Sequence, residues 1–278
     1  MRLSPRLAQR LALGVLWALT GGTVLLLLLL LGYVLAQGLP QLSLEFLTAG
    51  PRDMGRQGGI LPMVVGTLYV TAIAVAVATP LGLGTAIYLT EYTSEGFLTR
   101  LVRFGAECLA GVPSIIFGLF GFVFFVILLG LGWSVLAGGL TLAFMILPTV
   151  IRTAEEAIKA VPAGYREVAY SLGASKWQAI VRVVLPSALP GIVTGIILGI
   201  GRSISETAAV IFTAGSSLQM PLALLDPART MSVHFYLLAR EGLSMEKAWA
   251  TAAVLVLAIL LINLAAYALM SRFLRRFR

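Results

Sequence analysis

The sequence predicts an all-α integral membrane protein, and three observations carry that prediction. Of the 278 residues, 59% are hydrophobic before the 29 glycines are counted, and only 12% are charged. The mean hydropathy is +0.97. Long apolar runs recur from one end of the chain to the other. Because a soluble domain carries about 25% charged residues, this chain has too little polar side chain to cover a surface that faces water.

Six apolar runs are long enough to be membrane-spanning helices, which need about 20 residues to cross the hydrocarbon core. They are bounded by charges or turn residues and cover 11–36, 61–89, 108–131, 134–151, 188–213 and 248–270. The first run exceeds the apolar stretch of about 7 to 15 residues in a cleaved secretory signal, so we interpret it as an uncleaved anchor. No linker interrupts the pattern, and we expect one transmembrane domain over 1–278.

The distribution of Lys and Arg between the loops predicts the orientation. Loops on the side of the two termini carry 14 of these residues, among them Arg2, Arg276 and Arg278, and loops on the other side carry 5. Because Lys and Arg accumulate in cytoplasmic loops, both termini are expected in the cytoplasm. The net charge of +8 is explained by this orientation, and we expect no nucleic-acid partner.

The motifs of catalysis, metal binding and nucleotide binding are missing from the sequence. One cysteine and one histidine exclude a multi-cysteine metal site and a pair of histidine ligands. No phosphate-binding loop of the Gly-x-x-x-x-Gly-Lys-Ser/Thr type occurs. We expect Cys108 to be a small buried hydrophobic residue and His234 to have a packing or interfacial role. The sequence therefore predicts no enzyme activity and no metal site.

The fifth run holds the most informative polar residues, in the segment Gly-Ile-Gly-Arg-Ser-Ile-Ser-Glu-Thr that ends at Thr207. Arg202 and Glu206 are four apart, so on a continuous helix they would share one face. Because an Arg at the bilayer centre costs at least about 2.5 kcal/mol, this face is expected to turn away from lipid. The interpretation we favour is a polar lining for a substrate route, formed by Arg202, Ser203, Glu206 and Thr207. The alternative is an internal salt bridge that locks the bundle.

The chemistry of the two charged groups suggests which substrate such a route would carry. The planar guanidinium of Arg202 suits a phosphate-like oxyanion, which it can bind through two parallel hydrogen bonds. The carboxylate of Glu206 can accept a proton from hydrogen phosphate, whereas it would only repel sulfate.

Two further patterns concern helix packing and the long inner loop, 152–187. Gly191, Gly195 and Gly199 form a ridge on one helix face, which predicts either a static packing seam or a sliding surface. In the loop we expect a short helix, a break at Gly173, and a second helix with Trp177, Ile180, Val181 and Val184 on one apolar face. Such a helix would lie on the lipid surface or dock into a groove of a partner protein.

The loop residues Glu167 to Pro186 resemble the EAA loop of binding-protein-dependent ABC importer permeases. The shared pattern is roughly Glu-Ala-Ala-x-x-x-Gly-Ala, a hydrophobic residue six positions later and a closing Leu-Pro; this chain has Val168 for Ala and Ile180 for the usual Phe. The resemblance covers about 60–271. The segments Gly-Arg-Ser-Ile-Ser-Glu-Thr-Ala from Gly201, Phe-Thr-Ala-Gly from Phe212 and Arg-Thr-Met-Ser-Val-His from Arg229 are similar to the PstA branch, the permeases of phosphate importers.

The resemblance implies a type I ABC importer permease fold with six transmembrane helices in the bacterial inner membrane. It implies a heterodimer with the homologous permease PstC, two copies of the ATPase PstB and phosphate delivery by the binding protein PstS. The ATPase would bind ATP and magnesium, and this chain would need no cofactor. The residues implied in coupling to the ATPase are Glu167, Ala169, Gly173, Ala174, Trp177, Ile180, Leu185 and Pro186.

The expected function is therefore the uptake of inorganic phosphate by alternating access, driven by a partner ATPase. Three alternatives stay open at this point. The nearest is a permease for another oxyanion, sulfate or molybdate. An intramembrane enzyme such as a lipid transferase could also use a buried pair of Arg and Glu. The third alternative is a subunit with only a structural role in an assembly, in which both charged residues should be replaceable by apolar ones.

Overall fold

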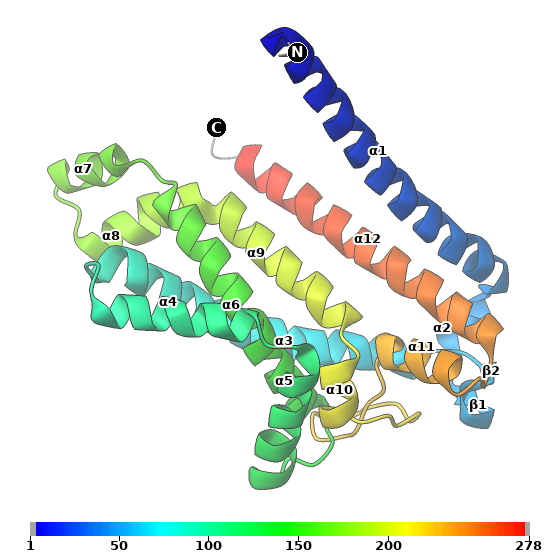
Figure 1. Cartoon of the computed structure of the whole chain (residues 1–278). Coiled ribbons are helices and arrows are strands. Elements are labelled where there is room, and N and C mark those ends of the chain that lie inside the picture. Colours follow the sequence, from blue (N-terminus) through cyan, green and yellow to red (C-terminus); the bar gives the residue numbers. More distant parts are fainter. Residues whose placement is uncertain (1–3, 276–278) are drawn as a thin grey trace.

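The computed structural model describes residues 4–275, so Arg2, Arg276 and Arg278 of the charge tally lie outside the described residues. Helices dominate, with short 3-10 and π segments labelled η and one two-residue antiparallel strand pair (Figure 1). The elements are α1 (Pro5–Gly38), η1 (Leu39–Gln41), α2 (Leu44–Thr48), β1 (Pro51–Arg52), η2 (Asp53–Gly55), β2 (Gln57–Gly58), α3 (Leu61–Ile87), η3 (Tyr88–Tyr92), α4 (Phe97–Ala110), α5 (Ser114–Gly121), η4 (Phe122–Leu128), α6 (Val135–Lys159), α7 (Ala163–Ser171), α8 (Lys176–Ala179), η5 (Ile180–Val184), α9 (Leu185–Ser205), α10 (Ala208–Thr213), α11 (Met231–Arg240) and α12 (Met245–Arg275).

Five helices of the described chain are long and apolar enough to cross a membrane, in agreement with five of the six predicted spans. They are Gln9–Gln41, Leu61–Tyr92, Val135–Lys159, Lys176–Ser205 and Met245–Arg272. The remaining predicted span corresponds to a bent pair, because α4 and the continuous α5–η4 helix meet at 101°, and such a pair is either one broken span or a re-entrant loop. The all-α membrane fold is therefore confirmed, with five candidate spans formed by single helices in the described residues and a sixth if the bent pair is one span.

The third predicted span, 108–131, is not one helix, and a proline explains why. Pro113 directly precedes α5 with extended backbone angles, φ −58° and ψ 142°. The ring of a proline also disfavours helical angles for the residue before it, so α4 ends before this point. Cys108 lies in the last turn of α4 and is exposed, which corrects the expectation of a buried residue.

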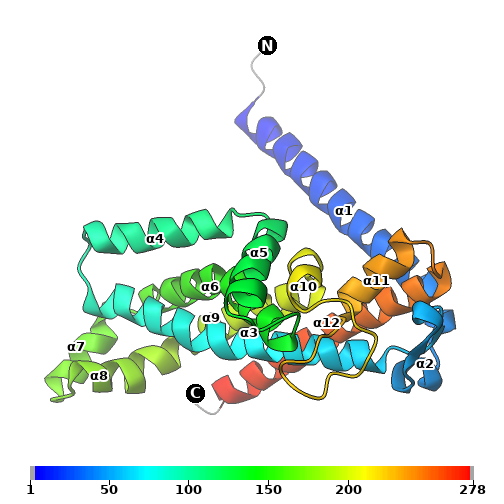
Figure 2. The same cartoon turned by 90° about the horizontal axis from the view of Figure 1, so that it is seen from below.

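Different elements lie at the two ends of the molecule. Figure 1 and Figure 2 show the start of α1, the end of α12 and the α7–α8 segment towards one end, and α2, the strand pair and α11 towards the other. The C-terminal part of α1 packs against the start of α12, where Tyr33 and Trp249 meet edge to face with ring centroids 5.5 Å apart, and Figure 2 shows the rest of α1 diverging from the bundle. The apolar side chains over 11–31 are otherwise exposed, as a surface that faces lipid requires.

The core of the bundle is built by α3, α6 and α9, with α6 packed against both of the others. The largest buried cluster joins Val70 of α3, Leu142 and Ile146 of α6 and Val210 of α10. The glycine ridge of α9 faces α6. A Cβ atom at Gly191 would meet Ala157, one at Gly195 would meet Thr153, and one at Gly199 would meet Ile146 and Val150. The ridge is therefore a packing seam, and sliding along it stays a prediction.

Replacing Gly195 by alanine tests this seam. A Cβ atom there would lie 2.7 Å from the Cβ of Thr153, so Gly195→Ala must push α9 away from α6. We expect a loss of about 1 to 3 kcal/mol of stability, as for other overpacked cores. The measurement is the thermal unfolding midpoint in detergent, with Gly84→Ala as the control because a Cβ atom at Gly84 would meet no neighbour within 4 Å. Equal midpoints for both variants would contradict the close contact.

Candidate functional site

The predicted pathway residues lie at a break in the fifth span. Helix α9 ends at Ser205, and Glu206 leaves it with extended backbone angles of φ −73° and ψ 130°. Helix α10 begins at Ala208. The prediction that Arg202 and Glu206 share one face of a continuous helix is therefore wrong. Arg202 occupies the last turn of α9, and Glu206 lies beyond its end.

The break between α9 and α10 contains no glycine or proline, and Glu206 accepts two hydrogen bonds that stabilise the backbone there. Its Oε1 accepts a hydrogen bond from the backbone N–H of Ala209 at 3.3 Å, in the first turn of α10. Its carbonyl oxygen accepts one from the hydroxyl of Ser232 in α11 at 2.6 Å. Non-helical backbone inside a helical bundle needs such partners, because water cannot replace them there. The carboxylate is thus part of the backbone structure at the break.

Arg202 is partly exposed and lacks a counterion in the described part of the chain. No carboxylate there lies within 4.0 Å of its guanidinium, so the alternative of an internal salt bridge with Glu206 is not formed. Thr207 is also partly exposed, whereas Ser203 is only 3% exposed and its hydroxyl has no hydrogen-bond partner. The structure therefore gathers Arg202, Glu206 and Thr207 around the break and turns Ser203 into the bundle.

Arg229 precedes α11 and His234 lies within it, close in sequence to Ser232, which donates its hydroxyl to the carbonyl of Glu206. The Nε of Arg229 donates to the carbonyl of Ser216 at 2.9 Å, and its Nη1 lies 3.5 Å from Nδ1 of His234. His234 is 1% exposed. Burial, and then the charge of Arg229, lower the pKa of His234 to about 3. The imidazole is uncharged at neutral pH, which agrees with the predicted packing role.

The inner loop has the predicted backbone of helix, glycine break and second helix. Helix α7 ends at Ser171, and Gly173 has φ +83°, a left-handed conformation that favours glycine. Ser175 then caps α8: its hydroxyl accepts the Gln178 N–H, and the Gln178 side chain accepts the Ser175 N–H. Helix α8 continues through η5 into α9 without a break, so Leu185 and Pro186 lie within one long helix.

The side chains of this loop do not form the single apolar face predicted for the second helix. Ile180 and Val184 are buried, whereas Trp177 is 59% exposed and Val181 is exposed as well. Ile180, Val181 and Val184 lie in the η5 π segment, whose wider turns alter the helical spacing used for the prediction, whereas Trp177 lies before it in α8. Glu167 is exposed, Ala169 is buried and Ala174 is partly buried. The most exposed apolar side chains of the loop are Val168, Leu172 and Trp177.

A family model described as "Binding-protein-dependent transport system inner membrane component" matches residues 78–278. The chain belongs to this family. It is therefore a multi-pass inner-membrane component of a transport system and not an enzyme, as the sequence predicts.

Curated relatives and solved structures agree with this membership. The chain is 33% identical over 253 residues to the probable ABC transporter permease protein YqgI of Bacillus subtilis, which covers 85% of this chain and 86% of that protein. It is 39% identical over 212 residues to the phosphate transport system permease protein PstA 1 of Mycobacterium tuberculosis, covering 75% and 69%. Its fold resembles the inward-facing MetNI methionine ABC transporter, with TM-score 0.65 at 20% identity, 77% of this chain and 95% of that one. A bacterial alginate ABC importer gives TM-score 0.66 at 17% identity, covering 96% and 99%.

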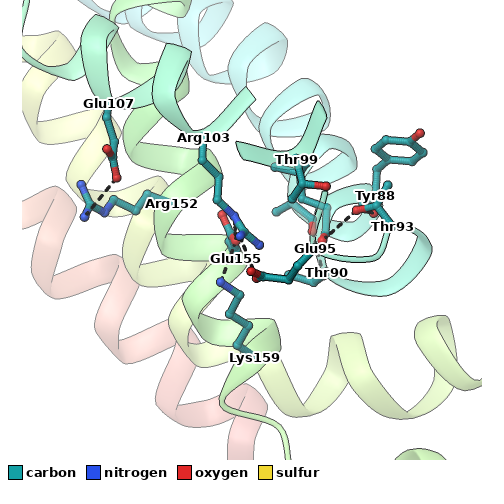
Figure 3. Close-up of polar contacts among 12 residues, drawn as sticks. Tyr88, Thr90, Thr93, Glu95, Thr99, Arg103, Glu107, Arg152, Glu155 and Lys159 are labelled. Atoms are coloured by element: carbon teal, nitrogen blue, oxygen red, sulfur yellow. Dashed lines mark hydrogen bonds and ion pairs between the residues drawn. The ribbon is translucent and has the colours of Figure 1, made fainter. Parts of the chain in front are cut away.

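A cluster of ion pairs at the α7–α8 end of this transport component was missed by the sequence analysis (Figure 3). Glu155 of α6 is buried, and its Oε1 accepts the Nε of Arg103 at 2.7 Å and lies 2.8 Å from Nζ of Lys159. Arg103, from α4, also donates to Glu95 at 3.0 Å. This hydrogen bond lowers the pKa of Glu95. The cluster therefore ties α4 and the turn before it to α6.

Only one contact of this cluster could have been predicted from the sequence. Glu155 and Lys159 are four apart in the favourable order for a helical ion pair, which predicts their contact. Arg103 and Glu155 are 52 residues apart, and nothing local connects them. Their pairing follows from the bend between α4 and α5, which the apolar run did not predict.

Replacing Glu155 by leucine tests what the cluster contributes. The apolar side chain would leave Arg103 and Lys159 without their shared buried carboxylate, so we expect Glu155→Leu to lose about 1 to 3 kcal/mol of stability. Partial exposure of both cations reduces the loss below that of a fully buried pair. Glu107→Leu is the control, since Glu107 is 61% exposed and 3.9 Å from Arg152. Thermal unfolding in detergent measures both, and a larger loss in Glu107→Leu would refute the ranking.

Proposed function

We propose that the chain is the permease subunit of an importer that moves inorganic phosphate into the cytoplasm by alternating access, driven by a partner ATPase. The observation that carries the proposal is the similarity to proteins named phosphate transport system permease protein PstA, at 30% to 39% identity over three quarters or more of this chain for relatives from four genera. The guanidinium of Arg202, in the last turn of α9, is a group suited to binding phosphate and so supports the proposal.

Arg202 is proposed as the phosphate-binding group of the pathway. A guanidinium at membrane depth costs several kcal/mol unless a counterion or water compensates it, and the described structure offers no carboxylate within 4.0 Å. A passing phosphate would supply that counterion and accept two of its N–H groups. Thr207, partly exposed at the same break, adds a hydroxyl donor. Ser203, buried with a free hydroxyl, would take part only after α9 moves.

Glu206 is proposed to favour hydrogen phosphate over sulfate. One carboxylate oxygen already accepts the Ala209 N–H, which fixes the position of the group at the break. A protonated phosphate oxygen can donate to such a carboxylate, whereas sulfate carries no proton at neutral pH and is repelled. The break thus combines one attractive and one discriminating charge.

The remaining subunits are proposed from the family. This chain would form a heterodimer with the homologous permease PstC, rest on two copies of the ATPase PstB and receive phosphate from the binding protein PstS. The ATPase would bind ATP and magnesium. Both termini would lie in the cytoplasm, on the side of α7 and α8.

The exposed apolar side chains of the α7–α8 loop support a docking role towards the ATPase. Val168, Leu172 and Trp177 project from a loop whose backbone is fixed by Gly173 and by the cap at Ser175. Unpartnered apolar side chains at the water-facing end of a membrane protein favour contact with a partner. The proposed coupling residues remain Glu167, Ala169, Gly173, Ala174, Trp177, Ile180, Leu185 and Pro186.

Arg202→Gln tests the substrate role. In an intact complex with its partner subunits we expect phosphate uptake to fall at least tenfold, because the neutral amide loses the charge and the paired donors. Arg202→Lys should retain part of the uptake, since it keeps the charge but not the fork. Uptake of labelled phosphate is measured with sulfate and molybdate as competitors, and Arg240→Gln is the control, because Arg240 is exposed at the end of α11. Normal uptake in Arg202→Gln would refute the role, and stronger competition by sulfate would identify a different oxyanion.

Gly173→Val tests the coupling loop. Valine strongly disfavours φ +83°, so α7 and α8 must shift relative to each other. We expect the subunit to insert and to bind the ATPase, while hydrolysis no longer rises with the loaded binding protein. Gly164→Val is the matched control, because that glycine lies within α7 and a Cβ atom added to it would meet no neighbour within 4 Å. Normal stimulation in Gly173→Val would show that the left-handed turn is not needed for coupling.

A further inference from the structure

Arg166 joins three elements at the α7–α8 end of the molecule. From the first turns of α7, its Nε and Nη2 donate to Oε1 of Glu91 in η3 at 3.0 and 2.6 Å. Its Nη1 donates to the carbonyl of Val161 at 2.8 Å, and Nη2 also donates to that of Ile158 at 3.1 Å. These carbonyls belong to the end of α6 and the turn after it. The guanidinium thus holds α7, the end of α6 and the extension of α3 in one arrangement.

The burial of this contact indicates a positioning role. The side chains of Arg166 and Glu91 are 19% and 6% exposed, whereas the nearby pair of Arg152 and Glu107 is 69% and 61% exposed. A buried ion pair adds little net stability compared with apolar side chains of the same size, but its directional hydrogen bonds fix geometry. Arg166 directly precedes Glu167, the first residue of the coupling-loop pattern.

The helix that carries Glu91 reaches the opposite end of the molecule. Leu61–Tyr92 is one continuous helix of 32 residues. At 1.5 Å per residue it is about 48 Å long. Near its other end, the buried Thr67 hydroxyl oxygen accepts the backbone N–H of Met231, in the first turn of α11, at 2.9 Å. Figure 2 shows α3 running from the α7–α8 end towards α11 and α2.

Helix α11 is in turn bonded to the break in the fifth span. Ser232, the residue after Met231, donates its hydroxyl to the carbonyl of Glu206 at 2.6 Å. Hydrogen bonds therefore connect the coupling loop to the proposed phosphate site through one helix, with Arg166 and Glu91 at one end and Thr67 at the other. The other route from the loop to the site is the continuous helix Lys176–Ser205 itself.

We propose that Arg166 and Glu91 are positioning residues of the transport cycle, which make α3 move with the coupling loop and so displace the Glu206 carbonyl through Thr67 and α11. This inference rests on the proposed function, because it takes the α7–α8 loop as the docking site of the ATPase. It adds α3 as the element that carries the motion and names the contacts at its two ends.

The experiment compares Glu91→Gln and Thr67→Val in the complete reconstituted complex with its ATPase and binding protein. Both variants should assemble and hydrolyse ATP, and both should lower the phosphate moved per ATP hydrolysed at least fivefold. The double variant should move as much phosphate per ATP hydrolysed as the more impaired single variant, because both changes interrupt the same chain of contacts. Thr67→Ser keeps the accepting oxygen and should restore the wild-type ratio, and Arg152→Gln is the control for loss of an exposed ion pair.

Two results would overturn the inference. One is a wild-type ratio in Glu91→Gln or in Thr67→Val. The other is loss of the ATPase from purified Glu91→Gln complexes in proportion to lost uptake, which would make the pair a support for docking alone. If Glu91→Gln does not assemble, Thr67→Val still decides, since it leaves the ion pair intact. Failure of the proposed function gives a different result: if phosphate is not the substrate, the wild-type complex itself would not take up phosphate.

Discussion

A helix that ends inside a bundle leaves backbone groups that other parts of the chain must satisfy, and this constraint organises the structure around Glu206. The carboxylate accepts the Ala209 N–H and the carbonyl accepts the Ser232 hydroxyl, so the chain leaves α9 and begins α10 with partners on both sides. The same break places Arg202 in the last turn of α9 with no carboxylate at hand in the described residues. Glu206 thus satisfies backbone groups at the break and is also the residue proposed to discriminate between anions.

At the α7–α8 end, in contrast, the buried carboxylates form ion pairs. There Glu91 and Glu155 are each buried and each contacts an Arg, and Glu155 also contacts Lys159. Paired charges fix the relative positions of helices, because each partner would be left uncompensated if the other moved. An unpaired guanidinium instead leaves its donors free for a mobile anion. The contrast separates residues that hold the helices in place from those proposed to bind phosphate.

Much of this arrangement follows from the sequence, and the failures have physical causes. Apolar runs predicted the long helices because the hydrocarbon thickness sets their length, and Gly173 predicted a turn because few other residues adopt positive φ. Run length carries no information on breaks, so the bend before Pro113 and the end of α9 at Ser205 were missed. Helical spacing did not predict that Val181 is exposed while Ile180 and Val184 are buried, because all three lie in the π turns of η5. The contact of Arg166 with Glu91 joins residues 75 apart, which no local pattern encodes.

The break is connected on each side to the α7–α8 loop, which is proposed to couple to the ATPase. This geometry favours displacement of α9 relative to α11 over motion of both as one rigid body. On one side, Ser205 ends a continuous helix that begins at Lys176 in the loop. On the other, Glu206 is bonded to α11, which α3 links back to Arg166. Because α9 packs closely against α6 at Gly195, a tilt of α9 would pivot at this contact. Helix α3 would move separately, since its two ends are bonded to Arg166 and to Met231 of α11. Unequal movement of the two routes would change the separation of Arg202 from Glu206, which is what alternate exposure of a bound anion requires.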